Sequence, residues 1–397
     1  MDRFQFIAVV WGTAFTEAFL EFCLPSQLTP NNLPHFAKFS KAIYRIYTRT
    51  SDAKIIKNSE SYKRLRTLMP VEIAVISGIS RVGKYKSMSE CHAHSIRTSS
   101  DEDISFVFIC PDVVWADGAF ARLLEIAHSG KRLVAVFTPR LIKENFLPAL
   151  SKRSKEHRGF DAIKPRELVR MAMEHLHPEV TSMIWNSGKP SSTLFTGLFW
   201  SFPQGLLARQ FHLFPLMVKP VDRTTVPVIS LDADYTLNAC PDLEDIYVVC
   251  DSDELCGVDF TSVSDAISIL QSCSGDVIRE SAHWAGLHTH QIHREFVKYK
   301  ILFHADELPA DFYQIEQESD LIVDSILSLA DDPSCTKSPF ETSLRRYISA
   351  RFILSKIRDM GVVGFLQNAV LTVKNIAMRK VFGPNLTIRI LNPERPL

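Results

Sequence analysis

The chain has 397 residues, of which 46% are hydrophobic, and its 45 Lys and Arg residues balance its 45 Asp and Glu residues. A net charge of zero argues against a nucleic-acid-binding protein, which would offer the phosphates a broad basic surface. The eight cysteines are scattered without CxxC spacing, which predicts buried free thiols in a cytoplasmic protein. We expect no signal peptide, and no run of about 18 apolar residues predicts a membrane-spanning helix.

The first 140 residues alternate between apolar strands and amphipathic helices. The predicted strands are FQFIAVVWG (4–12), AIYRIYT (42–48), VEIAVIS (71–77), ISFVFIC (104–110) and RLVAVFT (132–138). The predicted helices are TAFTEAFLEFCLPSQL (13–28), IIKNSESYKRLRTL (55–68), YKSMSECHAHSIRTSS (85–100) and DGAFARLLEIAHSG (117–130). Apolar strands separated by such helices indicate an α/β fold with a mainly parallel sheet covered on both faces. Ligands of these sheets gather at the carboxyl ends of the strands.

The pattern changes near residue 143. A charged link and a helix (164–178) lead into a region rich in aromatic residues, Pro and Gly, with short strands such as DIYVVCDSDE (245–254). From residue 262 on, the pattern is mostly helical. We therefore predict three regions, 1–142, 143–261 and 262–397, of which the second extends the sheet and walls a pocket.

Two acids follow the fourth predicted strand. Asp112 stands where the strand ends, and Pro111 stiffens the turn out of the sheet. A carboxylate that closes an apolar strand needs a partner, and a hard divalent cation is one such partner. Asp117 stands where the next helix begins, which favours an N-cap.

The segment from the fourth strand through DGAFARLLEIA resembles the metal-binding segment of GT-A glycosyltransferases. In many of these enzymes a strand ends in Asp-x-Asp, and a helix follows a few residues later. Cys110 stands where the first Asp would be, so only Asp112 carries over as a metal ligand. The similarity covers about residues 1–140, and the opening strand VVWG also resembles the nucleotide-binding half of that fold.

The resemblance implies a GT-A-like mixed sheet, mainly parallel, and a nucleotide-diphosphate sugar as donor. Region 1–142 would bind the nucleotide, with contacts from Trp11, Gly12 and Asp112. Region 143–261 would be the acceptor side, and the acceptor would be a glycan or another molecule. Mg²⁺ or Mn²⁺ on Asp112 would hold the diphosphate. Arg81 and Lys84, in a basic Gly-containing segment after the third strand, are further candidates for contact with the diphosphate.

Asp251 and Asp253 follow a strand in YVVCDSDEL. Alternate strand residues face the same side, so the two carboxylates would point into one space. They would hold a metal, or one would be the base that deprotonates an acceptor hydroxyl. A polar turn at a strand end is an equally good interpretation. ISLDADY contains a second Asp-x-Asp pair, Asp232 and Asp234.

The histidines allow several roles. His212 lies in an apolar, strand-like run, where a buried core role is the commoner interpretation and a metal or phosphate ligand the functional one. His290 and His293 would come close together on a helix, which permits a metal, although a packing or solvated role is favoured. His304 ends another apolar run and is an alternative pocket residue.

Two functions from different classes remain open. The first is a glycosyltransferase. The second is a non-catalytic GT-A-like protein that binds a glycan or a partner protein, which the missing first Asp at position 110 favours. An unrelated α/β hydrolase or phosphatase has no nucleophile motif to support it. The C-terminal segment 343–382 carries Arg345, Arg346, Arg351 and Lys356, which permit peripheral contact with an anionic membrane, although packing onto the main domain is slightly favoured.

Overall fold

The computed structural model describes residues 2–79, 83–99, 103–156, 162–188, 196–266, 276–330 and 387–391. Its main feature is a sheet in the order β11-β6-β10-β4-β1-β2-β3-β14. The bounds are β1 Arg3–Val9, β2 Lys41–Thr48, β3 Val71–Ser77, β4 Ile104–Ile109, β6 Leu133–Val136, β10 Phe214–Val218, β11 Ile246–Val248 and β14 Thr387–Ile390. The central strands are parallel, whereas β10 is antiparallel to both its neighbours and β14 is antiparallel to β3. This arrangement confirms the mainly parallel, mixed α/β fold.

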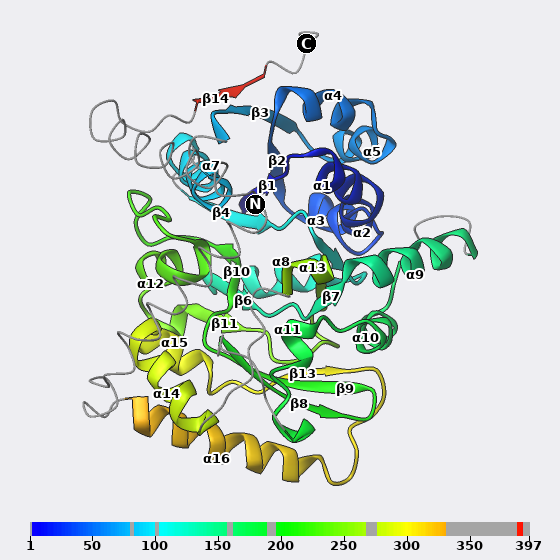
Figure 1. The fold of residues 1–397 in the computed structure, drawn as a ribbon. Coiled ribbons are helices and arrows are strands. Elements are labelled where there is room, and N and C mark those ends of the chain that lie inside the picture. The colour runs from blue at the N-terminus through cyan, green and yellow to red at the C-terminus, as the bar shows by residue number, and fades with distance from the viewer. Residues whose placement is uncertain are drawn as a thin grey trace, which may run out of the picture.

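Helices cover this sheet on both faces. α1 (Thr13–Ala18), α2 (Leu24–Gln27), α3 (Leu33–Phe39), α4 (Thr50–Asn58) and α5 (Glu60–Leu68) lie on one side of β1 to β3, and α7 (Lys84–Thr98) lies on the other (Figure 1). α8 (Ala119–His128) packs next to α3. Strand β4 is buried along its whole length, as a central strand covered on both faces must be.

Residues from region 143–261 complete the sheet. β10 carries Pro215 near its centre, and the pairing register shifts between Pro215 and Met217. A bulge of this kind is where a sheet accommodates proline, which has no N–H for the ladder. β10 and β11 thus extend the sheet begun by the first 142 residues, as the sequence pattern predicts.

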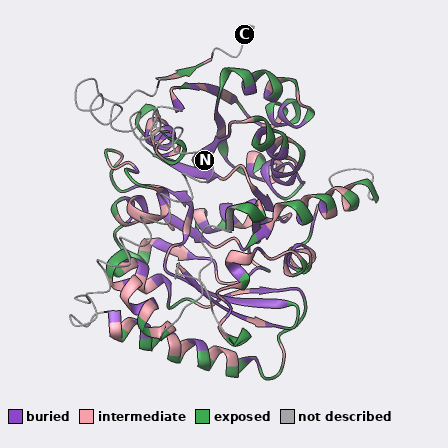
Figure 2. Cartoon of the chain, in the orientation of Figure 1, coloured by how far each residue is buried: buried purple, intermediate pink, exposed green. Residues whose placement is uncertain are grey.

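Two three-stranded sheets stand beside the main one. The first joins β5 (Val113–Trp115), β12 (Gly257–Thr261) and β7 (Arg140–Ile142). The second joins β13 (Ile301–His304), β9 (Gly205–Gln210) and β8 (Gly197–Phe202). Figure 2 shows that these strands are largely buried.

Both faces of the second small sheet are buried, because alternate side chains along its strands pack into two different cores. Leu198 and Trp200 pack into a separate core with α14 (Val277–His288) and α16 (Phe312–Ala330), whereas Phe199 belongs to the main core. Successive side chains of a strand point to opposite faces, so one strand can join two cores. The sheet therefore ties the helical C-terminal part to the main domain.

The remaining helices connect these layers. They are α9 (Lys143–Glu156), α10 (Pro165–Glu174), α11 (Pro178–Thr181), α12 (Thr236–Ala239), α13 (Val263–Ala266) and α15 (Gln291–Phe296), with short turns η1 (Phe19–Cys23), η2 (Trp185–Ser187), η3 (Leu231–Tyr235) and η4 (Leu243–Asp245).

Several local predictions need correction. The helix predicted over 55–68 is two helices, because Ser59 is extended and its side chain accepts from the Tyr62 N–H to cap α5. The residue before α8 is Gly118, in a left-handed conformation, so Asp117 is not the N-cap. The part after residue 262 also contains β13 and β14, which its helical pattern does not predict.

Some predictions fall on other residues. Segment 343–382, with its four basic residues, and Arg81 lie outside the described residues. Within the described part of the chain, no helix is both long and apolar enough to cross a membrane.

Candidate functional site

The carboxyl end of β4 brings Asp112 beside a strand from far along the chain. After Ile109 the backbone turns at Pro111 and re-enters the fold as β5, which pairs antiparallel with β12. The Phe260 N–H donates to the Asp112 carbonyl at 3.1 Å. Asp259, one residue earlier on β12, is paired with Val113. Asp112 and Asp259 therefore come from adjacent strands at the same edge.

Asp259 is held by a cation on one oxygen only. Its Oδ2 accepts from Arg140 Nε at 3.1 Å, and Arg140 Nη1 also donates to Glu179 at 2.7 Å. Asp259 Oδ1 is buried and has no hydrogen-bond partner among the described residues. Burial raises the pKa of Asp259, and Arg140 opposes the rise. Oδ1 is therefore a buried hydrogen-bond acceptor that is not satisfied by these residues.

Asp112 has an unusual affinity for protons. Burial raises its pKa to about 6, the negative charge of Asp259 adds to the rise, and Arg140 and Lys143 partly offset it. A carboxylate in this position gains from either a proton or a metal cation, because each removes an uncompensated negative charge.

A third acid, Asp232, acts by its charge on Cys110, the residue two before Asp112. Burial raises the pKa of the Cys110 thiol, and the charges of Asp112, Asp259 and Asp232 raise it further. Asp232 lies in η3 and its side chain accepts from Ser230 Oγ at 2.6 Å. Its neighbour Asp234 accepts instead from three backbone N–H groups, those of residues 228, 229 and 230. Asp234 thus orders the turn, while the charge of Asp232 is near enough to act on Cys110. We call Asp112, Asp259 and Asp232 the crevice acids.

His212 is in the loop between β9 and β10, so its predicted place in a strand is wrong. Its ring centroid is 4.2 Å from that of His293 and 6.0 Å from that of Trp284. His293 Nδ1 accepts from the His290 N–H, so its Nε2 donates to the Asp232 carbonyl at 3.2 Å. Burial lowers the pKa of His212 and lowers that of His293 to about 4. These contacts fit neutral packed rings behind Asp232, and the metal role of His212 stays a prediction.

Asp251 and Asp253 do come together, but with other partners. β11 ends at Val248, so both acids lie in a turn and not on alternate strand positions. His304 Nε2 is 3.2 Å from Asp251 Oδ1 and 3.7 Å from Asp253 Oδ2. Within the described residues, these three side chains are the one group of three or more metal-ligating residues whose ligand atoms all lie within 4.8 Å of one another. This group, which we call the edge triad, could hold a metal.

The predicted nucleotide contacts lie at the start of the fold. Trp11 follows β1, and the Gly12 N–H donates to Asp52 Oδ2 at 2.7 Å. Asp52 is 3% exposed and anchors the start of α4 against the end of β1. Lys84 opens α7, where its ammonium group lies 4.7 Å from the centre of the Tyr85 ring. Their contact with a nucleotide stays a prediction.

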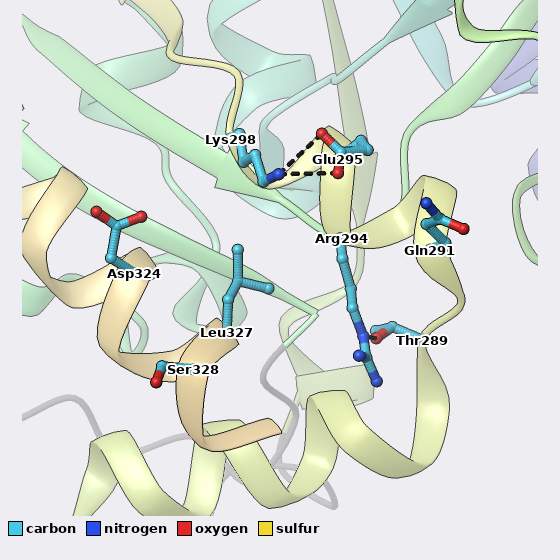
Figure 3. Close-up of a pocket in the computed structure, with 8 residues that line it drawn as sticks. All are labelled: Thr289, Gln291, Arg294, Glu295, Lys298, Asp324, Leu327 and Ser328. Carbon is cyan, nitrogen blue, oxygen red and sulfur yellow. Dashed lines mark hydrogen bonds and ion pairs between the residues drawn. The ribbon is translucent and has the colours of Figure 1, made fainter. Parts of the chain in front are cut away.

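A cavity of about 690 Å³ lies elsewhere, between α15, the end of α14 and α16 (Figure 3). Its lining consists of Thr289, Gln291, Arg294, Glu295, Lys298, Asp324, Leu327 and Ser328. Lys298 is ion-paired with Glu295 at 2.8 Å, and Arg294 Nε donates to Thr289 at 3.2 Å. Cations that already have partners on the cavity wall do not make it a strong anion site, so the crevice acids remain the better candidate.

Comparison with known proteins gives fold-level likenesses alone. No protein-family model and no curated protein matches the chain. Among solved structures, S. aureus TarS 1–349 aligns over 100% of this chain and 98% of its own, with 11% identity and a TM-score of 0.36. The longer S. aureus TarS structure aligns over 83% of this chain and 43% of its own, with 9% identity and a TM-score of 0.29. Apo mouse xyloside xylosyltransferase 1 aligns over 39% of this chain, with 9% identity and a TM-score of 0.24, and only 59% of that chain is covered.

Proposed function

We propose that this chain is a glycosyltransferase that moves a sugar from a nucleotide-diphosphate donor to a hydroxyl group of an acceptor. The observation that carries the proposal is the pair of partly buried carboxylates, Asp112 and Asp259. Both have a raised pKa, and Asp259 Oδ1 is a buried atom without a hydrogen-bond partner among the described residues. They lie at the carboxyl end of β4, where α/β sheets bind their ligands.

The residues present fit a hard divalent cation. Asp259 Oδ1 is an orphaned buried acceptor, and carboxylate oxygens are the ligands that Mg²⁺ and Mn²⁺ prefer. Asp112 and Asp259 would hold the ion, which supplies positive charge to a diphosphate leaving group. Cys110 replaces the first acid of the Asp-x-Asp pattern, and Asp259 supplies a second carboxylate from β12 in its stead.

Asp232 is our candidate for the base on the acceptor side. In transfer with inversion, the acceptor oxygen bonds to the anomeric carbon, the bond from that carbon to the diphosphate oxygen breaks, and the base takes the hydroxyl proton. Asp232 suits this role because its charge acts on Cys110, and because its carboxylate accepts from the Ser230 hydroxyl and not, like Asp234, from three backbone N–H groups. Asp251 or Asp253, the base predicted from the sequence, is the alternative.

Around these acids, Trp11 and Gly12 would contact the nucleotide, and Lys84 the diphosphate. The acceptor would enter beside Asp232. Arg140 and Lys143 add positive charge near Asp112, which favours an anionic ligand in the crevice.

Titration calorimetry tests the proposal. The wild type is titrated with UDP and with GDP, each with and without Mn²⁺. We expect one of the nucleotides to bind and Mn²⁺ to strengthen its binding at least about tenfold, as the loss of a charged interaction in a partly buried site would imply. Absence of binding by either nucleotide would favour the non-catalytic alternative, a protein that uses the same fold to hold a glycan or a partner protein.

A further inference from the structure

The edge triad lies at the end of β11, the outermost strand on its side of the main sheet, away from β4 and the crevice acids. We propose that Asp251, Asp253 and His304 form a second divalent-cation site, of a kind that takes Mn²⁺ or Zn²⁺. The proposal does not depend on sugar transfer, because none of the three residues interacts with Asp112 or Asp259 in the contacts described above.

The backbone fixes the triad before any ion arrives. Asp251 forms a bridge with Leu302 on β13, the Ser252 N–H donates to the Leu302 carbonyl at 2.9 Å, and the Leu302 N–H donates to the Cys250 carbonyl at 2.8 Å. The His304 N–H donates to Ser252 Oγ at 3.3 Å. Hydrogen bonds thus connect the turn after β11 with the end of β13. The turn supplies Asp251 and Asp253, and β13 supplies His304.

The orientation of His304 is set by a second-sphere contact. Its ring is buried, and Nδ1 lies 2.8 Å from the carbonyl oxygen of Asp306. A carbonyl oxygen only accepts, so Nδ1 carries the proton. In the neutral ring, Nε2 then presents its lone pair to the two carboxylates. A histidine whose other nitrogen donates to a backbone carbonyl is the usual arrangement of a metal-ligating imidazole.

The spacing of the ligand atoms fits a shared cation. A charge-assisted N–H to carboxylate bond has a length of about 2.7–2.9 Å. Nε2 lies farther than that from both carboxylates, at 3.2 Å and 3.7 Å. Two ligands that are each about 2.1 Å from one ion lie about 3.0 Å apart at a right angle and about 3.4 Å apart at the tetrahedral angle. The observed separations are of that size.

Charges around the triad leave room for a dication. Arg166 forms a bidentate pair with Asp253 and a further pair with Glu307. Asp251, Asp253 and Glu307 against Arg166 sum to −2 with His304 neutral. Arg166 also fixes the orientation of Asp253, because its Nε donates to Oδ1 at 3.1 Å and its Nη2 donates to Oδ2 at 2.8 Å.

The site is open on one side. The side chains of Asp251 and Asp253 are 43% and 39% exposed, so water or an anionic ligand can complete the coordination. Two oxygen ligands and one imidazole suit Mn²⁺ or Zn²⁺, whereas Ca²⁺ needs six to eight oxygens. Three protein ligands with an open position are typical of a metal site that can bind an exogenous ligand.

The test uses the whole chain, freed of metal by chelation, and no nucleotide. Mn²⁺ is titrated while electron paramagnetic resonance follows the free ion, and pulsed measurements detect nitrogen coupled to the bound ion. We expect nitrogen coupling from His304 in the wild type. His304→Gln should abolish the coupling, and Asp251→Asn should weaken Mn²⁺ binding at least about tenfold.

Two matched controls decide the outcome. Asp306→Asn keeps the carbonyl that orients His304 and should leave the coupling unchanged. Asp112→Asn should also leave it unchanged, which separates this site from the crevice. Coupling that survives in a folded His304→Gln variant, or a folded wild type that binds neither Mn²⁺ nor Zn²⁺, would overturn the proposal. Circular dichroism establishes that each variant is folded.

Discussion

Asp112 of the crevice acids and Asp251 and Asp253 of the edge triad follow the carboxyl ends of β4 and β11 in the main sheet, yet their surroundings differ. Asp112 and Asp259 are partly buried, and this burial raises the pKa of each. Asp251 and Asp253 are well exposed, and Asp253 is neutralised by Arg166 at the surface. A charged aspartate therefore lowers stability after β4, where it is partly removed from water, and has little effect on stability after β11, where water solvates it.

This difference in exposure indicates which of the two groups should bind a cation more strongly. A partly buried carboxylate oxygen without a hydrogen-bond partner gains strongly from a cation. Folding has already removed the water that would solvate this oxygen, so cation binding does not have to. An exposed triad gains mainly from geometry, because water competes for each ligand. Removing a charge should accordingly have large consequences in the crevice and smaller ones at the edge.

The largest expected effect comes from Asp112→Asn. The variant keeps the size of the side chain and removes the charge that would hold the cation. We expect metal-dependent nucleotide affinity to fall about a hundredfold, and transfer to be lost, because a charged ligand in a partly buried site is worth about 3 kcal/mol. Asp251→Asn should leave nucleotide affinity unchanged in the same calorimetric titration. Equal metal-dependent affinity in Asp112→Asn and the wild type would remove Asp112 from the site.

The next effect compares two arginines. Arg140→Gln removes the cation from Asp259 and Glu179, whose side chains are each only 15% exposed. Because Arg140 itself is 44% exposed and partly screened by water, the change should lower the free energy of unfolding by about 1–2 kcal/mol. Arg166→Gln affects partners that are 39% and 86% exposed, and should leave stability nearly unchanged. Urea denaturation of both variants measures the contrast.

Adding Asp259→Asn to the Arg140→Gln variant checks the cause. The neutral Asn no longer needs a counter-charge, so the double variant should recover part of the lost stability. Equal stability of the two single arginine variants would show that burial does not separate the two regions energetically.

The sequence predicts the parts of this molecule that depend on local pattern. Strands such as β4 are continuous apolar runs, and an acid directly after one, Asp112, must lie at the sheet edge. Asp259 was missed because it comes to Asp112 only through the pairing of β5 with β12. The one signal was an acid inside the apolar strand GVDFT, where an unpaired charge would be costly.

The edge triad, too, could not be assembled from local sequence pattern. Asp251, Asp253 and His304 were each noticed as polar residues at strand ends, but nothing local links residue 251 to residue 304. The link is the backbone bridge between Asp251 and Leu302, which depends on β13. Asp117 failed as an N-cap for a related reason, because a tertiary partner, Asn31, takes its carboxylate.

A smaller effect is expected from the histidines behind Asp232. The pKa of His293 lies near 4 in the folded chain, below the ordinary value of 6.5, and His212, His290 and Asp232 face it. The unfolded chain binds more protons between these two values, so the stability from neutral His293 is complete above about pH 6.5 and is lost as the pH falls toward 4. His293→Gln should lose about 1 kcal/mol less stability than the wild type between pH 7 and pH 5, measured by urea denaturation. Equal losses would show that His293 does not stay neutral on folding.

The smallest effect concerns Asp117, which belongs to neither acidic group. Its carboxylate accepts from the Asn31 N–H at 2.9 Å and from Asn31 Nδ2 at 2.7 Å. In Asp117→Asn the new amide oxygen can keep the backbone bond, and the Asn31 amide can turn to accept from the new N–H, so the change should be within about 0.5 kcal/mol.

Asp117→Ala removes both bonds and should cost about 1–2 kcal/mol. A double-mutant cycle with Asn31→Ala identifies the partner, because the part of that cost due to the side-chain bond disappears once Asn31 has lost its amide. Strict additivity of the two alanine substitutions would mean that the side chains of Asp117 and Asn31 are not energetically coupled. The cost of removing Asp117 would then lie in its bond to the Asn31 backbone and in its place before Gly118, at the start of α8.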